Sequence, residues 1–133
     1  MGVDLFRVDN RGETPRFDDD VYFRATAHAW PLLVRVLAAV GVLDETIARP
    51  EDDLALRSPV AGAVPAWKLA SSGGWHVVPD ECVAIALALE AVVRATRLQI
   101  SDLEDDERAR LDFVERFARF NRTAAPHGGY AVC

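Results

Sequence analysis

The stretch from Ser71 to Leu98 constrains the fold of this chain more than any other segment. It reads as a turn, a short extended piece and then one long, nearly uncharged helix. Pro79 suits the first helical turn, where its missing N–H costs nothing, and Asp80 and Glu81 place negative charge at the positive end of the helix dipole. These signals predict a helix over about 79–98.

The expected helix carries a broad apolar surface. Apolar side chains recur at the spacing of one helical face at Cys82, Ile85, Ala86, Leu89, Val92 and Val93. Val83 and Leu87 widen this face, and Glu90 is the only charged residue between Cys82 and Val93. A helix of this kind must be covered on most sides, so we expect it to form the centre of the core.

Length and composition indicate one folded unit. Half of the 133 residues are hydrophobic and 27% are charged, which is typical of globular proteins and not of disordered chains. A chain of this length buries enough surface to fold by itself, so we expect a single globular domain over 1–133. The formal net charge of −6 argues against nucleic acid and against anionic membranes as partners.

The opening segment and the cysteines indicate the compartment. MGVDLFRVDN lacks the apolar core of a signal peptide, and no apolar run is long enough to span a bilayer, so we expect a cytoplasmic protein. Cys82 and Cys133 are then expected as free thiols. Because no Cys-x-x-Cys or His-Glu-x-x-His spacing is present, we expect neither a metal site nor a cofactor.

Strand patterns lie at both ends of the chain. Residues 3–8 alternate as a short strand, and an extended piece around 21–24 is expected to return beside it as a hairpin. The alternative for this second piece is a helix capped by Asp18–Asp20 that runs on through Thr26. Residues 130–133 are expected to add a strand to the hairpin, so that a small antiparallel sheet contains both termini.

Two further helices complete the predicted fold. Apolar spacing over 30–40, with Pro31 at its start and Gly41 after its end, predicts a buried helix. A final helix is expected after a capping box at Ser101 and Glu104, with a packing face at Leu103, Leu111, Val114, Phe117 and Ala118. Its favourable i, i+4 charge pairs are Glu104–Arg108, Asp106–Arg110, Asp112–Arg116 and Glu115–Arg119. The predicted class is α+β, with three main helices around the central one.

The segment from Leu43 to Ser72 shows no sustained period. A connection of this length in a compact domain tends either to carry function or to be mobile. It contains Trp67 and Lys68, the only lysine of the chain.

Five short segments share a pattern with known proteins. They are MGVDLFR at the start, Trp30-Pro31-Leu32-Leu33, Gly74–Val77 followed by Asp80-Glu81-Cys82, Phe117–Phe120, and Gly128–Val132. Together they resemble a family of small uncharacterised bacterial proteins of the actinobacterial type that has no assigned activity. The resemblance spans most of the chain and implies a compact single domain, but it transfers no catalytic residue.

Three residues are candidates for catalysis. His76 precedes the central helix, where it is a candidate general base or a ligand at a helix N-terminus, or else a loop histidine bonded to the first helical turn. His127 is flanked by glycines, which allow a close ligand approach or simply end a helix. Cys82 is a candidate nucleophile if the helix dipole lowers the pKa of its thiol, but its place in the apolar stripe favours a buried structural cysteine.

Aromatic and polar residues indicate a candidate ligand pocket. We expect Trp67, Trp75, His76, Glu81 and Tyr130 to contribute to it, with His127 at its rim and Arg24 or Lys68 as polar groups. The same residues would also serve as ordinary core.

The sequence contains no complete set of catalytic residues in a known pattern. The first functional hypothesis is therefore a ligand-binding or protein-interaction module with an acidic surface. The second is a small acid/base enzyme, in the style of secondary metabolism, that uses His76 or His127 with a carboxylate. A third is an immunity- or antitoxin-type partner, because an acidic surface steers toward basic proteins. The sequence leaves the ligand, the partner and a homodimer open.

Overall fold

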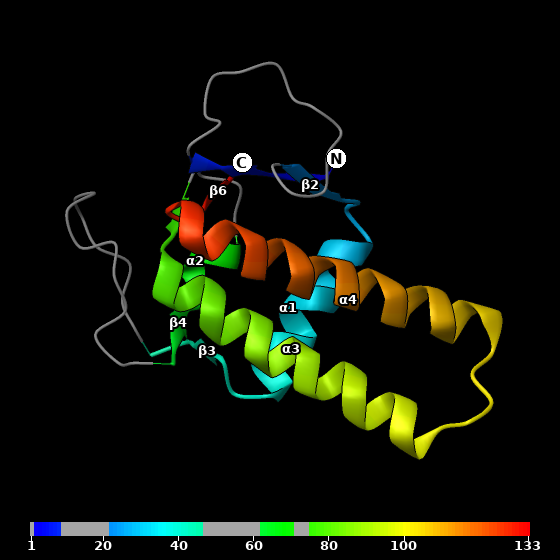
Figure 1. Ribbon diagram of the computed structural model, residues 1–133. Coiled ribbons are helices and arrows are strands. Elements are labelled where there is room, and N and C mark those ends of the chain that lie inside the picture. The colour runs from blue at the N-terminus through cyan, green and yellow to red at the C-terminus, as the bar shows by residue number, and fades with distance from the viewer. Residues whose placement is uncertain (1, 9–21, 47–61, 71–74) are drawn as a thin grey trace.

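The computed structural model describes residues 2–8, 22–46, 62–70 and 75–133 and has an α+β architecture (Figure 1). In chain order its elements are β1 (Val3–Arg7), β2 (Tyr22–Ala25), α1 (Ala29–Ala39), β3 (Leu43–Asp44), β4 (Val64–Pro65), α2 (Trp67–Ala70), β5 (Trp75–Val77), α3 (Pro79–Gln99), α4 (Asp105–Ala124), the 3₁₀ turn η2 (Ala125–His127) and β6 (Tyr130–Val132). The long helices α3 and α4 lie side by side with α1 behind them. None of the described helices is long and apolar enough to cross a membrane.

The four-stranded sheet contains strands from both ends of the chain, as predicted. Its order is β2-β1-β6-β5, and every pairing is antiparallel. Leu5 of β1 lies opposite Phe23 on one side and Val132 on the other, and all three are buried. The antiparallel pairing of the first two strands is confirmed, and the alternative of a helix over 22–25 is wrong. Asp18–Asp20 lie outside the described residues.

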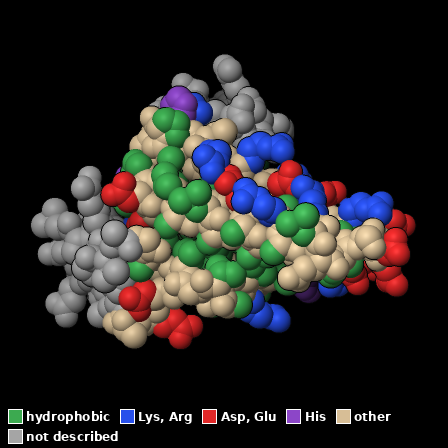
Figure 2. Space-filling view, turned by 60° about the horizontal axis from the view of Figure 1, so that its bottom comes forward, with side chains coloured by type: hydrophobic (Ala, Val, Ile, Leu, Met, Phe, Trp, Pro, Cys, Tyr) green, Lys and Arg blue, Asp and Glu red, His purple; other side chains and the backbone are tan. Residues whose placement is uncertain are grey.

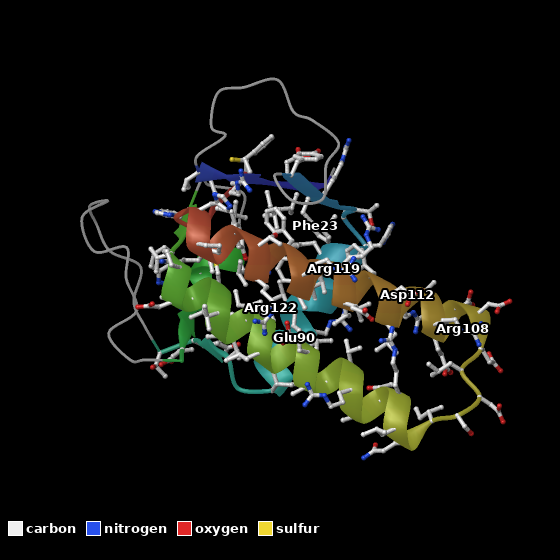
Figure 3. The ribbon with its side chains drawn as sticks, in the orientation of Figure 1. Phe23, Glu90, Arg108, Asp112, Arg119 and Arg122 are labelled. Carbon is white, nitrogen blue, oxygen red and sulfur yellow. The ribbon has the colours of Figure 1, made fainter. Side chains whose placement is uncertain are left out.

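The core lies where the helices meet the buried face of the sheet. Cys82, Ile85 and Leu89 of α3 are fully buried, which confirms the face predicted from the helical spacing. Burying an aliphatic side chain such as Ile85 or Leu89 contributes about 1.5–3 kcal/mol. The ring of Phe23 lies 5.3 Å from that of Phe117 in α4, so this aromatic contact joins the sheet to the helices (Figure 3).

The prediction that the central helix is covered on most sides is wrong. Val83 and Leu87 of α3 are 46% and 56% exposed, and Leu98 is 82% exposed. The physical reason is that α1, α4, β4 and η2 bury one face of α3, while no described element covers the opposite face. Figure 2 shows hydrophobic side chains gathered across the centre of one face of the molecule, with Lys and Arg side chains beside them.

The helix ends agree with the sequence signals in one case and differ in the other. α1 has nearly the predicted bounds, and Gly41 follows it at a φ of 81°, which glycine adopts without strain. The predicted capping box is wrong, because α4 begins at Asp105 and Glu104, at its N-cap, makes no side-chain capping hydrogen bond. Ser101 lies in the link of residues 100–104 that reverses the chain from α3 into α4.

The predicted charge pairs of α4 are formed only in part. Glu115 and Arg119 are paired at 3.7 Å. In the described part of the chain, Glu104 and Arg108 do not form an ion pair with each other, and neither do Asp106 and Arg110. The first turn of α4 is exposed, and an exposed ion pair gains little over two separately hydrated charges.

The segment between α1 and β5 contains short elements that the sequence does not predict. β3 and β4 form a parallel pair, and α2 is a single helical turn. The Val64 N–H donates to the Val42 carbonyl at 2.8 Å. Elements of two to four residues are too short to show a period. They bring Trp67 and Lys68 to the N-terminal end of α3.

Candidate functional site

Most of the residues that the sequence suggests for a pocket lie around the start of α3. The rings of Trp67 and Trp75 meet edge to face with centroids 4.9 Å apart, and Lys68 Nζ lies 5.9 Å from the Trp67 ring centroid. Lys68 and Glu81 are 0% and 2% exposed. The structure therefore brings three of the predicted residues together around a buried lysine.

The Lys68–Glu81 pair ties three elements together. Lys68 Nζ donates to Glu81 Oε1 at 2.5 Å and to the His76 carbonyl at 2.9 Å, and the Val78 N–H donates to the same Glu81 oxygen at 3.0 Å. Burial raises the pKa of Glu81, against the opposing effect of the Lys68 hydrogen bond. A buried pair whose charges bind each other and the backbone holds α2, β5 and α3 in register, and it faces none of the hollows found between described residues.

The two candidate histidines lie near each other in the fold but in different surroundings. His76 is half-buried, and its Nε2 donates to the carbonyl of Gly128, the residue after His127, at 2.7 Å. The nitrogen that makes this bond holds its proton against the backbone and is not a free base. His127 is exposed at the end of η2. Neither histidine lines a hollow found between described residues. Among the described residues, no group of three or more His, Cys, Asp or Glu side chains is placed to hold a metal ion.

Cys82 and Tyr130 are buried in the core. Cys82 Sγ lies 3.7 Å from the Val77 carbonyl, and burial raises the pKa of the thiol to about 12. Desolvation thus outweighs the helix dipole, which was expected to lower that pKa, and the thiol stays protonated near neutral pH. Tyr130 is fully buried and donates its hydroxyl hydrogen to Asn121 Oδ1 at 2.9 Å, and burial raises its pKa as well. Both are structural in this environment.

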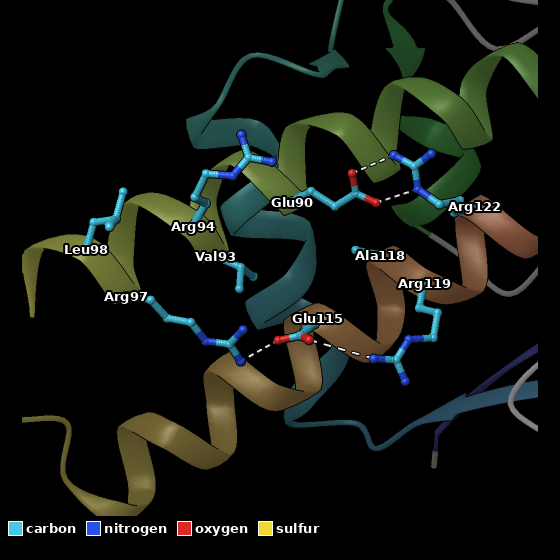
Figure 4. Close-up of a pocket in the computed structure, with 9 residues that line it drawn as sticks. All are labelled: Glu90, Val93, Arg94, Arg97, Leu98, Glu115, Ala118, Arg119 and Arg122. Carbon is cyan, nitrogen blue, oxygen red and sulfur yellow. Dashed lines mark hydrogen bonds and ion pairs between the residues drawn. The ribbon is translucent and has the colours of Figure 1, made fainter. Parts of the chain in front are cut away.

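A hollow lies between α3 and α4, away from these residues. It has a volume of about 470 Å³, within the usual range of small-molecule sites (Figure 4). Its walls contain four arginines, two glutamates and three apolar residues, which are Arg94, Arg97, Arg119, Arg122, Glu90, Glu115, Val93, Leu98 and Ala118. We call it the α3–α4 groove.

The charges of the α3–α4 groove are incompletely balanced. Arg122 binds Glu90 with two parallel bonds, Nε to Oε1 and Nη2 to Oε2, each 2.6 Å long, and this pairing lowers the pKa of Glu90. Glu115 is shared between Arg97 and Arg119, and Arg97 also lies 3.5 Å from Asp112 Oδ1, just beyond the groove walls. Arg94 makes no ion pair with a described residue. Four guanidinium groups thus face three carboxylates, the wall residues Glu90 and Glu115 and the adjoining Asp112, in a chain whose net charge is −6.

The floor of the α3–α4 groove is apolar. Val93 and Ala118 are 5% and 1% exposed at the seam between the helices, while Leu98 is exposed at one end. Figure 4 shows the arginines of both helices around this floor. A cationic rim above an apolar floor suits a ligand that combines a negative group with an apolar body.

Sequence patterns do not predict the α3–α4 groove. They predict Arg119 only as the i, i+4 partner of Glu115, and Glu90 only as the single charge in the apolar stripe. The spacing of Glu90, Arg94 and Arg97 on one helix, and of Glu115, Arg119 and Arg122 on the other, contains the signal. This spacing indicates a shared groove only when the two helices are known to pack against each other.

Neither a protein-family model, a curated protein nor a solved structure matches this chain. The resemblance to small actinobacterial-type proteins stays a prediction.

Proposed function

We propose that this protein is a non-catalytic binding module that holds a small organic anion in the α3–α4 groove. The observation that carries the proposal is the excess of guanidinium groups over carboxylates around an apolar floor. Charge-assisted bonds from arginine to carboxylate or phosphate are among the strongest polar contacts available to a ligand. The ligand class is a carboxylate or a phosphate monoester attached to a compact apolar group.

The exposure of the arginines supports reversible binding. The side chains of Arg97, Arg119 and Arg122 are 48%, 64% and 58% exposed, so an anion can reach them from solvent. Their pairs with Glu115 and Glu90 hold the guanidinium groups in place before the ligand arrives, which reduces the entropy lost on binding.

The alternatives receive less support from the described contacts. An acid/base enzyme needs a free histidine facing a cavity, whereas His76 Nε2 is bonded to a backbone carbonyl. An acidic surface that attracts a basic protein would act elsewhere on the chain, because the α3–α4 groove favours anions.

Titration calorimetry with phenyl phosphate tests the proposal. We expect the double variant R94Q/R97Q to bind phenyl phosphate at least tenfold more weakly, because it leaves two arginines against the carboxylates of Glu90, Glu115 and Asp112. The matched control is R108Q, which removes an exposed arginine of α4 outside the groove and should bind as the native protein does (Figure 3). Inorganic phosphate, which lacks the apolar body, should bind more weakly than phenyl phosphate.

Binding should also weaken with added salt, because the rim charges are exposed. Equal affinity of R94Q/R97Q and R108Q for phenyl phosphate, or the absence of binding to the native protein, would contradict the proposal.

A further inference from the structure

A second hollowed region lies between α1 and α4 and shares no residue with the α3–α4 groove. Its wider part, of about 550 Å³, is lined by Arg35, Arg110, Leu32 and Phe113, together with His28 at the start of α1. None of its lining residues is an aspartate or a glutamate. The wider part therefore attracts anions.

A narrow slot adjoins the wider part and shares two of its walls, Leu32 and Arg110. The slot has a volume of about 250 Å³ and enters between α1, α3 and α4. Its surface is almost wholly aliphatic, from Leu32, Val36, Val92, Ile100, Leu111 and Val114. Glu107 is the single acidic residue at its edge.

The two cations at the junction are available to a ligand. Arg35 and Arg110 are exposed, and neither makes an ion pair with a described residue. Arg110 lacks the pair with Asp106 that the helical spacing predicts. In the α3–α4 groove, by contrast, three of the four arginines are already bonded to carboxylates.

The two parts meet at Leu32 of α1. His28, Ala29 and Arg35 line the wider part, Leu32 lines both parts, and Val36 lines the slot. The step of seven residues from Ala29 to Val36 rises roughly 10 Å along the helix. A charged group at the wider part would thus continue into an apolar chain in the slot.

We propose that the α1–α4 face is a second binding site, for an amphiphilic anion whose unbranched alkyl chain fills the slot while its carboxylate or phosphate head binds Arg35 and Arg110. The absence of acidic side chains in the wider part selects a negative head, and the aliphatic slot selects the chain. This site does not depend on the α3–α4 groove, because the two hollows have no wall in common.

The test is calorimetric titration of the full chain with decanoate below its micelle concentration. Decyl phosphate distinguishes a phosphate head from a carboxylate head, and tighter binding of either supports the site and identifies the head. Decyltrimethylammonium has the same chain with a positive head, and acetate has the head without the chain. We expect both of these to bind at least tenfold more weakly than decanoate.

Three variants locate the binding. R35Q/R110Q removes the two cations, and V36F fills the slot, and each should weaken decanoate binding at least tenfold. R94Q/R97Q, which alters only the α3–α4 groove, should bind decanoate as the native protein does. Circular dichroism checks that each variant is folded, and because the two arginines are exposed, R35Q/R110Q decides the test even if V36F does not fold.

Two results would overturn this inference. One is decanoate binding that survives R35Q/R110Q, and the other is decyltrimethylammonium binding as tightly as decanoate. Loss of decanoate binding in R94Q/R97Q alone would assign the amphiphile to the α3–α4 groove and refute a second site, while leaving the proposed function intact.

Discussion

Glu81 and Glu90 belong to the same helix, α3, and each is bonded to a basic residue of another element. Glu81 is 2% exposed and is paired with the fully buried Lys68, whereas the side chains of Glu90 and Arg122 are 32% and 58% exposed. Two ion pairs that each join a glutamate to a basic side chain thus have different roles. The buried pair is committed to the fold, because both of its charges also bond to the backbone, Lys68 to the His76 carbonyl and Glu81 to the Val78 N–H. The exposed pair stays in exchange with solvent and can respond to a ligand.

The largest expected effect comes from breaking the buried pair. Replacing Lys68 with Met leaves the Glu81 carboxylate buried without its cation, and this should lower the free energy of unfolding by about 3–5 kcal/mol. Urea unfolding at pH 7 measures the loss. The double variant K68M/E81L should recover a large part of it, because no uncompensated charge remains. A single variant as stable as the native protein would contradict the structural role of this pair.

The next effect concerns the pH dependence of the same buried region. The pKa of Cys82 is about 12 in the folded protein against 9.0 for an unperturbed thiol, so the unfolded chain loses this proton first as the pH rises. Stability is therefore intact below pH 9 and falls above it, by about 2 kcal/mol at pH 10.5. Urea unfolding at pH 8 and 10.5 measures the difference.

The control for this alkaline loss is C82A, which lacks the thiol and should lose correspondingly less stability between the two pH values. Tyr130, whose pKa burial also raises, accounts for part of what remains. Rapid reaction of Cys82 with a thiol reagent in the folded protein at pH 8, in a C133S background, would contradict a buried thiol with a raised pKa.

The smallest expected effect concerns the exposed pair. E90Q should change the free energy of unfolding far less than K68M does, because exposed pairs contribute little. It should strengthen phenyl phosphate binding roughly two- to fivefold, since one competing carboxylate is removed from the groove. Thermal melts and calorimetry measure the two quantities on the same sample. A stability loss equal to that of K68M would remove the distinction between the pairs.

Local patterns were sufficient for most of the fold. The apolar spacing after Pro79 predicts α3 and the burial of Cys82, and the alternation at residues 3–8 and 130–133 predicts a sheet that contains both termini. These features depend on neighbouring residues, whose periodicity reports directly on which side of an element faces the core. The predicted capping box failed because Ser101 lies in the link between α3 and α4, and the place where that link ends depends on the packing of the two helices and not on local sequence alone.

The sites depend on distances in space that the sequence does not contain. Lys68 and Glu81 are 13 residues apart, and Glu90 and Arg122 are 32 apart, so their contacts follow from the way α2, α3 and α4 are packed. The same packing leaves Val83 and Leu87 exposed although they resemble core residues. The sequence by itself determined the elements and their buried faces, because these follow from local periodicity. Only the tertiary structure decided which charges are buried together and which line a groove, because that depends on the register between helices.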